Sequence, residues 1–493
     1  MTSSLRPSTL KPSRLWLYPG LLFFALMIHG SLLGLTDDEA YYWVLAQRPA
    51  LGYAFHPPTV AWMIAAAQAW LGGIFGTHSS GVVRLPAALC SAGILYLGLR
   101  WMVQAGVSAN RLGRATLGLV SLAGVFAASW MMVPDLPMFL GWMMIFAATW
   151  ELCFESRKWS CVLLTLGCAL AVLSKYSGIL GVASSFFSIM IWAPSVEKRR
   201  PAAAMFLGLV IALIPIIVWN SQHEWASILY QIRDRHEGAE FSLKRYGKFW
   251  ASELLFAGPP LIFFALSFWK RVRVAENQVS RFVAVFALPA FLIFCVQPLW
   301  SDFKPHWALI VWLPFALELG WAFSQDLYTS LAKAQVGFGF TVMGISILFC
   351  HFPLQSWLIE KWSGQVPESR WDVTNDMYGW QEFARLLPAG LPVIGSRYQT
   401  AAQIAFALGD FERVALVPRD LKQRDEWASP DVVDSQGPDW PRLLKPVLFI
   451  TDNRYDAGPE FKHAKCEKVG HSTVKRGQYI AKSFRLWKCD PIL

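Results

Sequence analysis

Long apolar runs separated by short polar and basic segments recur along most of the 493-residue chain. A helix needs roughly 20 mainly apolar residues to cross the hydrocarbon core of a bilayer, and shorter runs are ambiguous. The chain is therefore expected to be a polytopic membrane protein, all-α over residues 1–352. The pattern predicts eleven spans, at residues 15–34, 85–105, 115–133, 136–154, 160–174, 178–193, 202–219, 251–269, 282–296, 307–323 and 336–352.

One further apolar segment, 60–76, needs a separate interpretation. A twelfth span there would invert everything after it and place the basic clusters outside the membrane. We therefore interpret it as an amphipathic or re-entrant helix at the outer surface. The first outer loop then runs from 35 to 84, which is too long for a simple connector.

The pattern changes after Phe352, where residues 353–493 become polar. Strand-like runs ("LPVIGS", "RVALVPR" and "KPVLFITDN") and a helical run ("TAAQIAFALG") predict a small α/β domain on the outer side. Cys466 and Cys489 both fall in this domain, whereas the other six cysteines lie in or beside the predicted spans. An oxidising periplasm would permit a disulfide between them, but the sequence leaves open whether they pair.

Composition and charge agree with a membrane protein. The chain is 55% hydrophobic and 16% charged, where soluble domains carry about a quarter charged residues. The net charge of +10 does not indicate a nucleic-acid partner, because Lys and Arg also set membrane topology. If the N-terminus is cytoplasmic and the C-terminal domain lies on the outer side, the short basic clusters lie inside. The exception is the outer loop 220–250, with Arg233, Arg235, Lys244, Arg245 and Lys248.

Unusual polar residues gather on the predicted outer face. An ionisable residue close to lipid is costly and is by default a candidate for function. The first outer loop holds the acids of "LTDDEAYYW", Asp37, Asp38 and Glu39, and also His56. Other outer turns hold Asp135, Lys175 and Lys304.

Each of these residues has a structural alternative that the sequence leaves open. Thr36 and Glu39 have the spacing of a capping box, and Asp135 is placed to cap a helix. Lys175 is placed to reach lipid headgroups. The histidines lack the spacing of metal ligands, so a metal site stays unknown.

Several segments carry a resemblance to a known family: "DDEAYYW…YAFHPP", "VPDLPMFLGW", "LSKYSGIL", "WNSQHEW", "KPHWALIVWLP" and "DMYGWQEFARLL…RYQTAAQIAFALGD". They resemble the bacterial relatives of the dolichyl-phosphate-mannose protein mannosyltransferases. This family includes the lipid A aminoarabinose and galacturonic acid transferases and has the GT-C fold. The resemblance spans almost the whole chain. The family has a single Asp before its Glu, so "DDE" leaves open which Asp corresponds, and adjacency to Glu39 favours Asp38.

The resemblance implies transfer of a sugar from a polyprenyl phosphate donor to a lipid, glycan or protein acceptor at the outer face, with inversion. A phosphate leaving group needs no acid partner, so one carboxylate suffices as general base. We expect Asp38 to be the base or to orient the acceptor, with Asp135 as a second carboxylate and Glu39 in support. Cations hold the donor phosphate, and the candidates are Arg233, Arg235, Lys175 and Lys304.

The remaining expectations concern substrate contacts and cofactors. Tyr41, Tyr42 and His56 are candidates for substrate binding, although the two tyrosines have an equal alternative in packing the loop helix. No cofactor is required by this chemistry, and a bound divalent metal stays open. The alternatives are a transporter or lipid flippase, an oligosaccharide ligase and a protein O-mannosyltransferase. Few charges lie in the middle of the spans and no repeat is visible, which disfavours a transporter.

Overall fold

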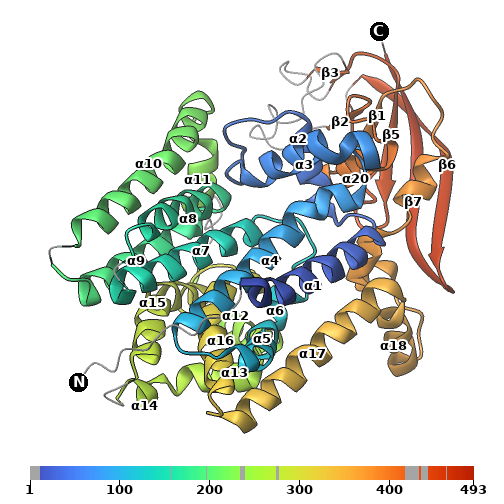
Figure 1. The fold of residues 1–493 in the computed structure, drawn as a ribbon. Helices are drawn as coiled ribbons and strands as arrows, with labels where there is room; N and C mark the ends of the chain where they lie inside the picture. The colour runs from blue at the N-terminus through green and yellow to red at the C-terminus, as the bar shows by residue number, and fades with distance from the viewer. Residues whose placement is uncertain are drawn as a thin grey trace. The chain divides into compact units, whose positions relative to one another are not determined.

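The computed structural model describes residues 12–155, 157–195, 197–233, 239–273, 277–416, 432–434, 442–461 and 463–492. It divides into two compact units (Figure 1). The first, which we call the helical unit, comprises Met1–Ile28, Leu51–Thr59 and Ala87–Ile345. The second, which we call the α/β unit, comprises His29–Ala50, Val60–Pro86 and Ser346–Leu493.

Helices make up the helical unit. Three of them, α1 (Pro12–Ser31), α4 (Ser80–Gln104) and α17 (Thr329–His351), continue into the α/β unit. The others are η1 (Ala109–Arg111), α5 (Leu112–Val120), α6 (Ala123–Phe126), α7 (Asp135–Trp150), η2 (Glu151–Glu155), α8 (Ser160–Ser174), η3 (Tyr176–Gly178), α9 (Ile179–Trp192), α10 (Arg199–Gln222), α11 (Ala226–Ile232), α12 (Leu243–Phe256), α13 (Pro259–Leu266), α14 (Phe268–Val272), α15 (Gln278–Phe294), η5 (Gln297–Leu299), η6 (Pro305–Ala308) and α16 (Leu309–Ser324).

Small residues let several of these helices pack closely. A Cβ added to Gly118 of α5 would lie 2.5 Å from the Cα of Gly320 in α16. In the same way, a Cβ on Gly141 of α7 would lie 2.5 Å from the backbone nitrogen of Ala171 in α8. Helices in lipid gain little from the hydrophobic effect, so close backbone approach at small residues is their usual means of association.

Six helices in the described part of the chain are long and apolar enough to cross a membrane, or seven if α12 and α13 form one bent span. The membrane class and helical character agree with the sequence, but the number of eleven spans is not confirmed. The predicted span 115–133 is wrong as one helix, because α5 ends at Val120 and α6 covers only Ala123–Phe126. The predicted span 251–269 contains a bend of 109° between α12 and α13.

Both breaks share one buried polar side chain, Gln335 of α17. Its amide nitrogen donates to the backbone oxygens of Ser121, after α5, and Ala257, after α12. Its amide oxygen accepts a hydrogen bond from the backbone nitrogen of Leu261 in α13. Backbone groups released by a helix break must find partners inside a membrane protein. Gly258, with φ +95°, and Pro259 explain why the chain turns at the second break.

The α/β unit contains the C-terminal sheet that the sequence predicts. Five strands lie in the order β2-β1-β5-β7-β6, with β1 parallel to β2 and β5, and the remaining pairs antiparallel. Ile394, Val447 and Phe449 on these strands belong to a buried hydrophobic core. The elements are α2 (Asp37–Gln47), α3 (Thr59–Phe75), α18 (Leu354–Ser363), η7 (Ser369–Trp371), η8 (Val373–Met377), α19 (Trp380–Ala384), β1 (Val393–Gly395), α20 (Tyr398–Leu408), β2 (Val414–Leu416), β3 (Val433–Asp434), β4 (Arg442–Leu443), β5 (Val447–Asp452), β6 (Ala464–Arg476) and β7 (Tyr479–Pro491).

The two longest strands, β6 and β7, form a hairpin that the sequence reading did not predict (Figure 1). Cys466 and Cys489 lie directly opposite each other in this hairpin and are joined by a disulfide. The pairing that the sequence left open is thus present in the structure.

Two helices occupy the predicted long outer loop. Helix α3 covers Thr59–Phe75, which confirms a helix at 60–76. Helix α2 lies beside α20 (Figure 1), where the Trp43 ring meets the Phe406 ring edge-on at 5.3 Å. The Trp43 indole also donates to the backbone oxygen of Thr77. These contacts hold the acidic start of α2 within the α/β unit.

Candidate functional site

The first turn of α2 begins with the capping box that its sequence predicts. The hydroxyl of Thr36 accepts a hydrogen bond from the backbone nitrogen of Glu39 at 3.4 Å. The Glu39 carboxylate in turn accepts from the backbone nitrogen of Thr36 at 3.0 Å. Two otherwise unpaired donors of the helix start are satisfied in this way. Thr36 and Glu39 therefore form the capping box that was the structural alternative for them.

Glu39 has a second partner, because it forms a buried ion pair with Arg84 of α4. The Arg84 Nε lies 2.8 Å from Glu39 Oε1 and its Nη2 lies 2.6 Å from Glu39 Oε2. The same guanidinium donates to the backbone oxygens of Gly30, Leu33 and Gly34. The planar guanidinium of Arg84 thus donates hydrogen bonds to carbonyls at the end of α1. The same group fixes the first turn of α2 through its pair with Glu39.

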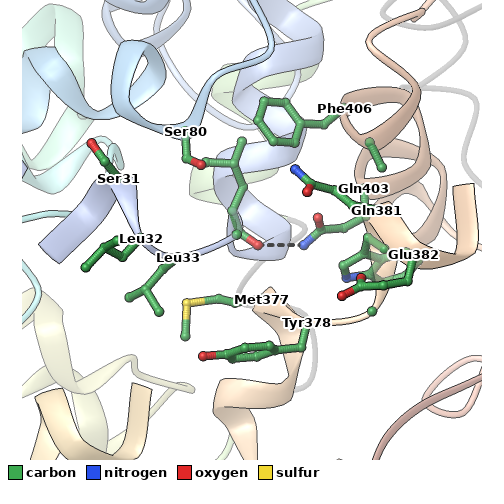
Figure 2. Close-up of a pocket in the computed structure, with 15 residues that line it drawn as sticks. Ser31, Leu32, Leu33, Ser80, Met377, Tyr378, Gln381, Glu382, Gln403 and Phe406 are labelled. Atoms are coloured by element: carbon green, nitrogen blue, oxygen red, sulfur yellow. Dashed lines mark hydrogen bonds between the residues drawn. The ribbon is translucent and has the colours of Figure 1, made fainter. Parts of the chain in front are cut away.

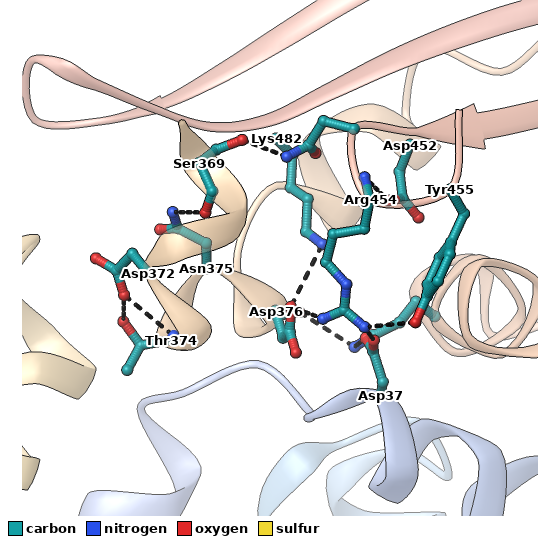
Figure 3. A network of polar contacts seen from close by, with 12 residues as sticks. Asp37, Ser369, Asp372, Thr374, Asn375, Asp376, Asp452, Arg454, Tyr455 and Lys482 are labelled. Atoms are coloured by element: carbon teal, nitrogen blue, oxygen red, sulfur yellow. Dashed lines mark hydrogen bonds and ion pairs between the residues drawn. The ribbon is translucent and has the colours of Figure 1, made fainter. Parts of the chain in front are cut away.

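Asp37 is also buried, and it contacts the C-terminal part of the α/β unit. Its Oδ2 lies 2.6 Å from the Nη2 of Arg454, and its Oδ1 accepts from the Gln403 amide at 3.0 Å. Arg454 also pairs with Asp376, so that one guanidinium lies between two carboxylates (Figure 3). We call Asp37, Asp376, Arg454 and the nearby Lys482 the Arg454 network.

Burial raises the pKa of Asp37 to about 6, and the negative charge of Asp376 acts in the same direction. The charges of Lys482 and Arg454 and the hydrogen bond from Gln403 oppose this rise. Removal from water disfavours the charged carboxylate, and here that effect exceeds the attraction of the cations.

Asp38 differs from both of its neighbours because it is exposed, whereas Asp37 and Glu39 are buried. It lies in the first turn of α2, where the helix dipole favours a negative charge. Asp37 and Glu39 are committed to ion pairs that hold the helix. Asp38 is the acid of this cluster that faces outward from the packed side of α2.

The aromatic residues that follow the acids pack inside the α/β unit. Tyr41 and Tyr42 are both buried, and the Tyr41 ring meets the Tyr398 ring of α20 at 5.1 Å. The two tyrosines are thus buried because they pack the loop helix, which is the alternative that the sequence left open for them. Their binding to substrate stays a prediction.

A pocket of about 230 Å³ lies beside the segment that leads into α2 (Figure 2). Leu32, Leu33 and Phe406 form part of its wall, together with the polar Gln403. The Gln403 amide donates to the backbone oxygen of Leu35 at 2.9 Å, so the pocket shares this residue with Asp37. Asp37, Asp38 and Glu39 are not among the residues that line it.

A second group of polar residues lies in the helical unit, around Asp135 at the start of α7. The Lys175 Nζ lies 2.7 Å from Asp135 Oδ1, and both residues are buried. The His306 Nε2 lies 3.8 Å from Asp135 Oδ2, and His56 interacts electrostatically with the same carboxylate. We call these four residues the Asp135 cluster. The structure therefore brings together side chains from four separate predicted outer segments.

Lys175 in this cluster also lies near an aromatic ring. Its Nζ is 5.8 Å from the ring centre of Trp307, within the range of a cation–π contact. The Asp135 carboxylate also compensates the charge of the buried Lys175 ammonium. This geometry does not match the alternative of a side chain extended toward lipid headgroups.

Two of the remaining predicted cations are exposed. Arg233 ends α11 and is exposed, as is Lys304 just before η6. Arg235 lies outside the described residues. Among the residues that the structure describes, no group of three or more His, Cys, Asp or Glu side chains is arranged to hold a metal ion.

The sequence reading missed the basic partners of the acids. Arg84 had a signal, because it is a charge close to the start of a long apolar run. Arg454 and Lys482 had none, since each is one of many basic residues in a polar domain. Their roles come from tertiary contacts: Arg454 bonds to Asp37, 417 residues away in the chain, and Lys482 lies near Asp376.

Comparisons with known proteins agree with this architecture. Residues 55–219 match the family model described as dolichyl-phosphate-mannose-protein mannosyltransferase. The lipid A galacturonosyltransferase RgtD of Rhizobium johnstonii is 24% identical over 321 residues, which cover 64% of this chain and 65% of that protein. The match thus spans slightly less than two thirds of the length of this relative.

Solved structures cover nearly the whole chain. ArnT from Cupriavidus metallidurans bound to undecaprenyl phosphate has a TM-score of 0.63 at 13% identity, over 97% of this chain and 98% of that one. The same protein in the apo state has a TM-score of 0.60 at 11% identity, over 96% and 97%. The chain is a multi-pass membrane protein with the GT-C fold. Its fold is that of ArnT, and its sequence is similar to that of a lipid A galacturonosyltransferase.

Proposed function

We propose that this protein is a membrane glycosyltransferase that moves one sugar from a polyprenyl phosphate donor to a lipid acceptor at the outer, periplasmic face of a bacterial inner membrane. Support comes from the likeness to a structure of ArnT that holds undecaprenyl phosphate and to a lipid A galacturonosyltransferase. The C-terminal part lies on the same outer side, and the N-terminus is cytoplasmic.

The reaction breaks the bond between the anomeric carbon and the phosphate oxygen of the donor. A bond forms between that carbon and an oxygen of the acceptor, with inversion, and polyprenyl phosphate leaves. Asp38 takes the proton from an acceptor hydroxyl as general base. If the acceptor atom is a phosphate oxygen, it is already ionised, and Asp38 then orients the acceptor instead.

Other residues act on the charge and the position of the reacting groups. Lys175 binds the donor phosphate and stabilises the charge that grows as the bond breaks, with help from Arg233, Arg235 and Lys304. Asp135 fixes the Lys175 ammonium at 2.7 Å. Glu39 positions α2 through Arg84 rather than touching the substrate. His56, Tyr41 and Tyr42 complete the proposed contacts.

Asp38 is assigned as the base because three consecutive acids, Asp37, Asp38 and Glu39, differ in their burial. Asp37 and Glu39 are buried in ion pairs with Arg454 and Arg84, while Asp38 is exposed. A general base must reach the acceptor, and among these three acids exposure fits only Asp38.

The test compares envelope lipids, glycans and proteins by mass spectrometry from cells with and without this protein. We expect one sugar to be lost from one lipid. Purified protein should then release polyprenyl phosphate from a defined donor only when that lipid is added. Movement of an intact donor lipid across vesicles without release of polyprenyl phosphate would instead indicate a flippase. Loss of a sugar from a protein would indicate a protein O-mannosyltransferase.

A further inference from the structure

A second, larger pocket lies in the α/β unit, on a face of the C-terminal sheet. Its volume is about 570 Å³, and its walls come from β5, β6, β7 and residues 366–370. None of the residues of the acid cluster on α2 lines it. It is therefore distinct from the pocket beside the start of α2.

The register of the sheet places a row of side chains across this pocket. Thr451 of β5 is paired with Arg485 of β7, and Arg485 is paired with His471 of β6. Paired residues of neighbouring strands project from the same face of a sheet. Lys475 lies further along β6 and also lines the pocket.

The pocket has balanced formal charges, because three acids and three cations line it: Glu368, Asp452, Asp456, Arg370, Lys475 and Arg485. Arg370 pairs with Glu368 at 2.6 Å, and Arg485 pairs with Asp456 at 3.5 Å. Within the described part of the chain, His471 and Lys475 form no ion pair, and both are exposed. An anion that enters the pocket would therefore find a cation without a competing carboxylate at the β6 side.

One polar atom at the base of the pocket lacks a partner. Thr451 is fully buried, and its Oγ1 has no hydrogen-bond partner among the residues that the structure describes. An unsatisfied buried hydroxyl costs about 1–3 kcal/mol, so such a group calls for an explanation. The neighbouring Thr400 hydroxyl, in contrast, donates to Asp452 at 2.7 Å. A ligand hydroxyl in the pocket would satisfy Thr451.

We propose that this pocket binds the anionic saccharide portion of the acceptor lipid, an inference that rests on the proposed function. Sugar hydroxyls hydrogen-bond to Thr451 and to the amide and hydroxyl side chains of Asn453, Gln478 and Ser483, all of which line the pocket. The negative group of the ligand pairs with Lys475, and His471 donates a further hydrogen bond. The site docks the acceptor and takes no part in bond breaking.

Direct binding tests the pocket without requiring transfer. The full-length protein in detergent micelles is titrated with lactose 1-phosphate, lactose and inorganic phosphate. We expect lactose 1-phosphate to bind at least 10-fold more tightly than either of the others. Lys475→Gln should weaken its binding at least 5-fold, and Lys465→Gln, on the same strand but outside the pocket, should not change it. Equal binding of inorganic phosphate, or no binding of lactose 1-phosphate, overturns the proposal.

Thr451→Val separates a ligand role from a structural one. Valine has nearly the same shape and lacks the unsatisfied hydroxyl, so the unfolding temperature should stay the same or rise. Binding of lactose 1-phosphate should nevertheless fall at least 3-fold. Unchanged binding by this folded variant contradicts the assignment of Thr451.

Turnover measurements distinguish the acceptor from the donor and from a failure of the proposed function. Lys475→Gln should raise KM for the acceptor at least 5-fold and leave KM for the polyprenyl phosphate donor unchanged. A rise in the donor KM alone overturns the acceptor assignment. Binding of lactose 1-phosphate without any transfer activity overturns the proposed function and the link to an acceptor, but upholds the saccharide pocket itself.

Discussion

Arg84 and Glu39 form a two-pronged ion pair in which both side chains are buried, with N–O distances of 2.8 and 2.6 Å. The pair joins the start of α4 to the first turn of α2, and Arg84 also holds the backbone at the end of α1. Asp38 lies immediately before Glu39 in the segment that this pair fixes. The position of the proposed base thus depends on a contact that involves no substrate.

Glu39→Gln should therefore destabilise the α/β unit strongly. Removal of one partner leaves a buried charge unpaired, which typically costs about 3–5 kcal/mol. We expect a clear fall in the unfolding temperature in detergent, measured by intrinsic fluorescence. The matched control is Arg48→Gln, which breaks the exposed pair between Arg48 and Glu412 and should cost less than about 1 kcal/mol. Equal effects of the two substitutions would show that the Arg84 pair adds no special stability.

Asp37 should give the protein a particular pH dependence. Its pKa is about 6 in the folded protein, above the ordinary value of 3.8, so the folded state binds the proton more tightly than the unfolded state. The stabilisation from this protonation is present below about pH 4 and is lost as pH rises to about 6. Asp37→Asn removes the titrating group. The unfolding temperature of wild type relative to Asp37→Asn should thus fall between pH 4 and 6 and stay level above it. A constant difference across this range would contradict the raised pKa.

Substitutions of Lys175 and Asp135 distinguish a role of this ion pair in stability from a role in activity. Lys175→Met alone leaves the Asp135 carboxylate buried without its 2.7 Å partner and should destabilise the helical unit. Lys175→Met combined with Asp135→Asn should recover much of the unfolding temperature. If Lys175 binds the donor phosphate, transfer should stay at least 100-fold below wild type in both variants. Recovery of activity together with stability would make the pair structural only.

The disulfide between Cys466 and Cys489 offers a test of the compartment. Six of the eight cysteines are free in the structure. Protein purified from membranes, denatured and labelled with a maleimide, should carry six labels without reductant and eight after reduction. Eight labels without reductant would contradict both the disulfide and a periplasmic location, because disulfides persist in oxidising compartments.

The sequence predicted those parts of the fold that depend on local pattern. The capping box of Thr36 and Glu39 follows from spacing alone, and so do α20 and the buried strand β5. The break after Val120 was not predictable in this way. Its freed carbonyl at Ser121 is satisfied by Gln335, more than 200 residues later in the chain.

The hairpin of β6 and β7 was missed for a different reason. Strand β6, "AKCEKVGHSTVKR", is mostly polar, so it lacks the alternation of apolar residues that identifies a half-buried strand. The site shows the same limit. Composition and position made Asp38, Asp135 and Lys175 candidates, but the buried partners of the neighbouring acids, Arg84 and Arg454, come from tertiary contacts.

The proposed role of Asp38 is tested most directly by the rate at which purified wild type and Asp38→Asn release polyprenyl phosphate, with saturating donor and the identified acceptor. Asp38 is exposed, so this substitution should leave the protein folded and lower the unfolding temperature only slightly. Loss of a general base typically lowers the rate by about 10²–10⁴-fold, and we expect a loss in that range for a hydroxyl acceptor. A rate within a few-fold of wild type in the folded variant would contradict the assignment of Asp38 as general base.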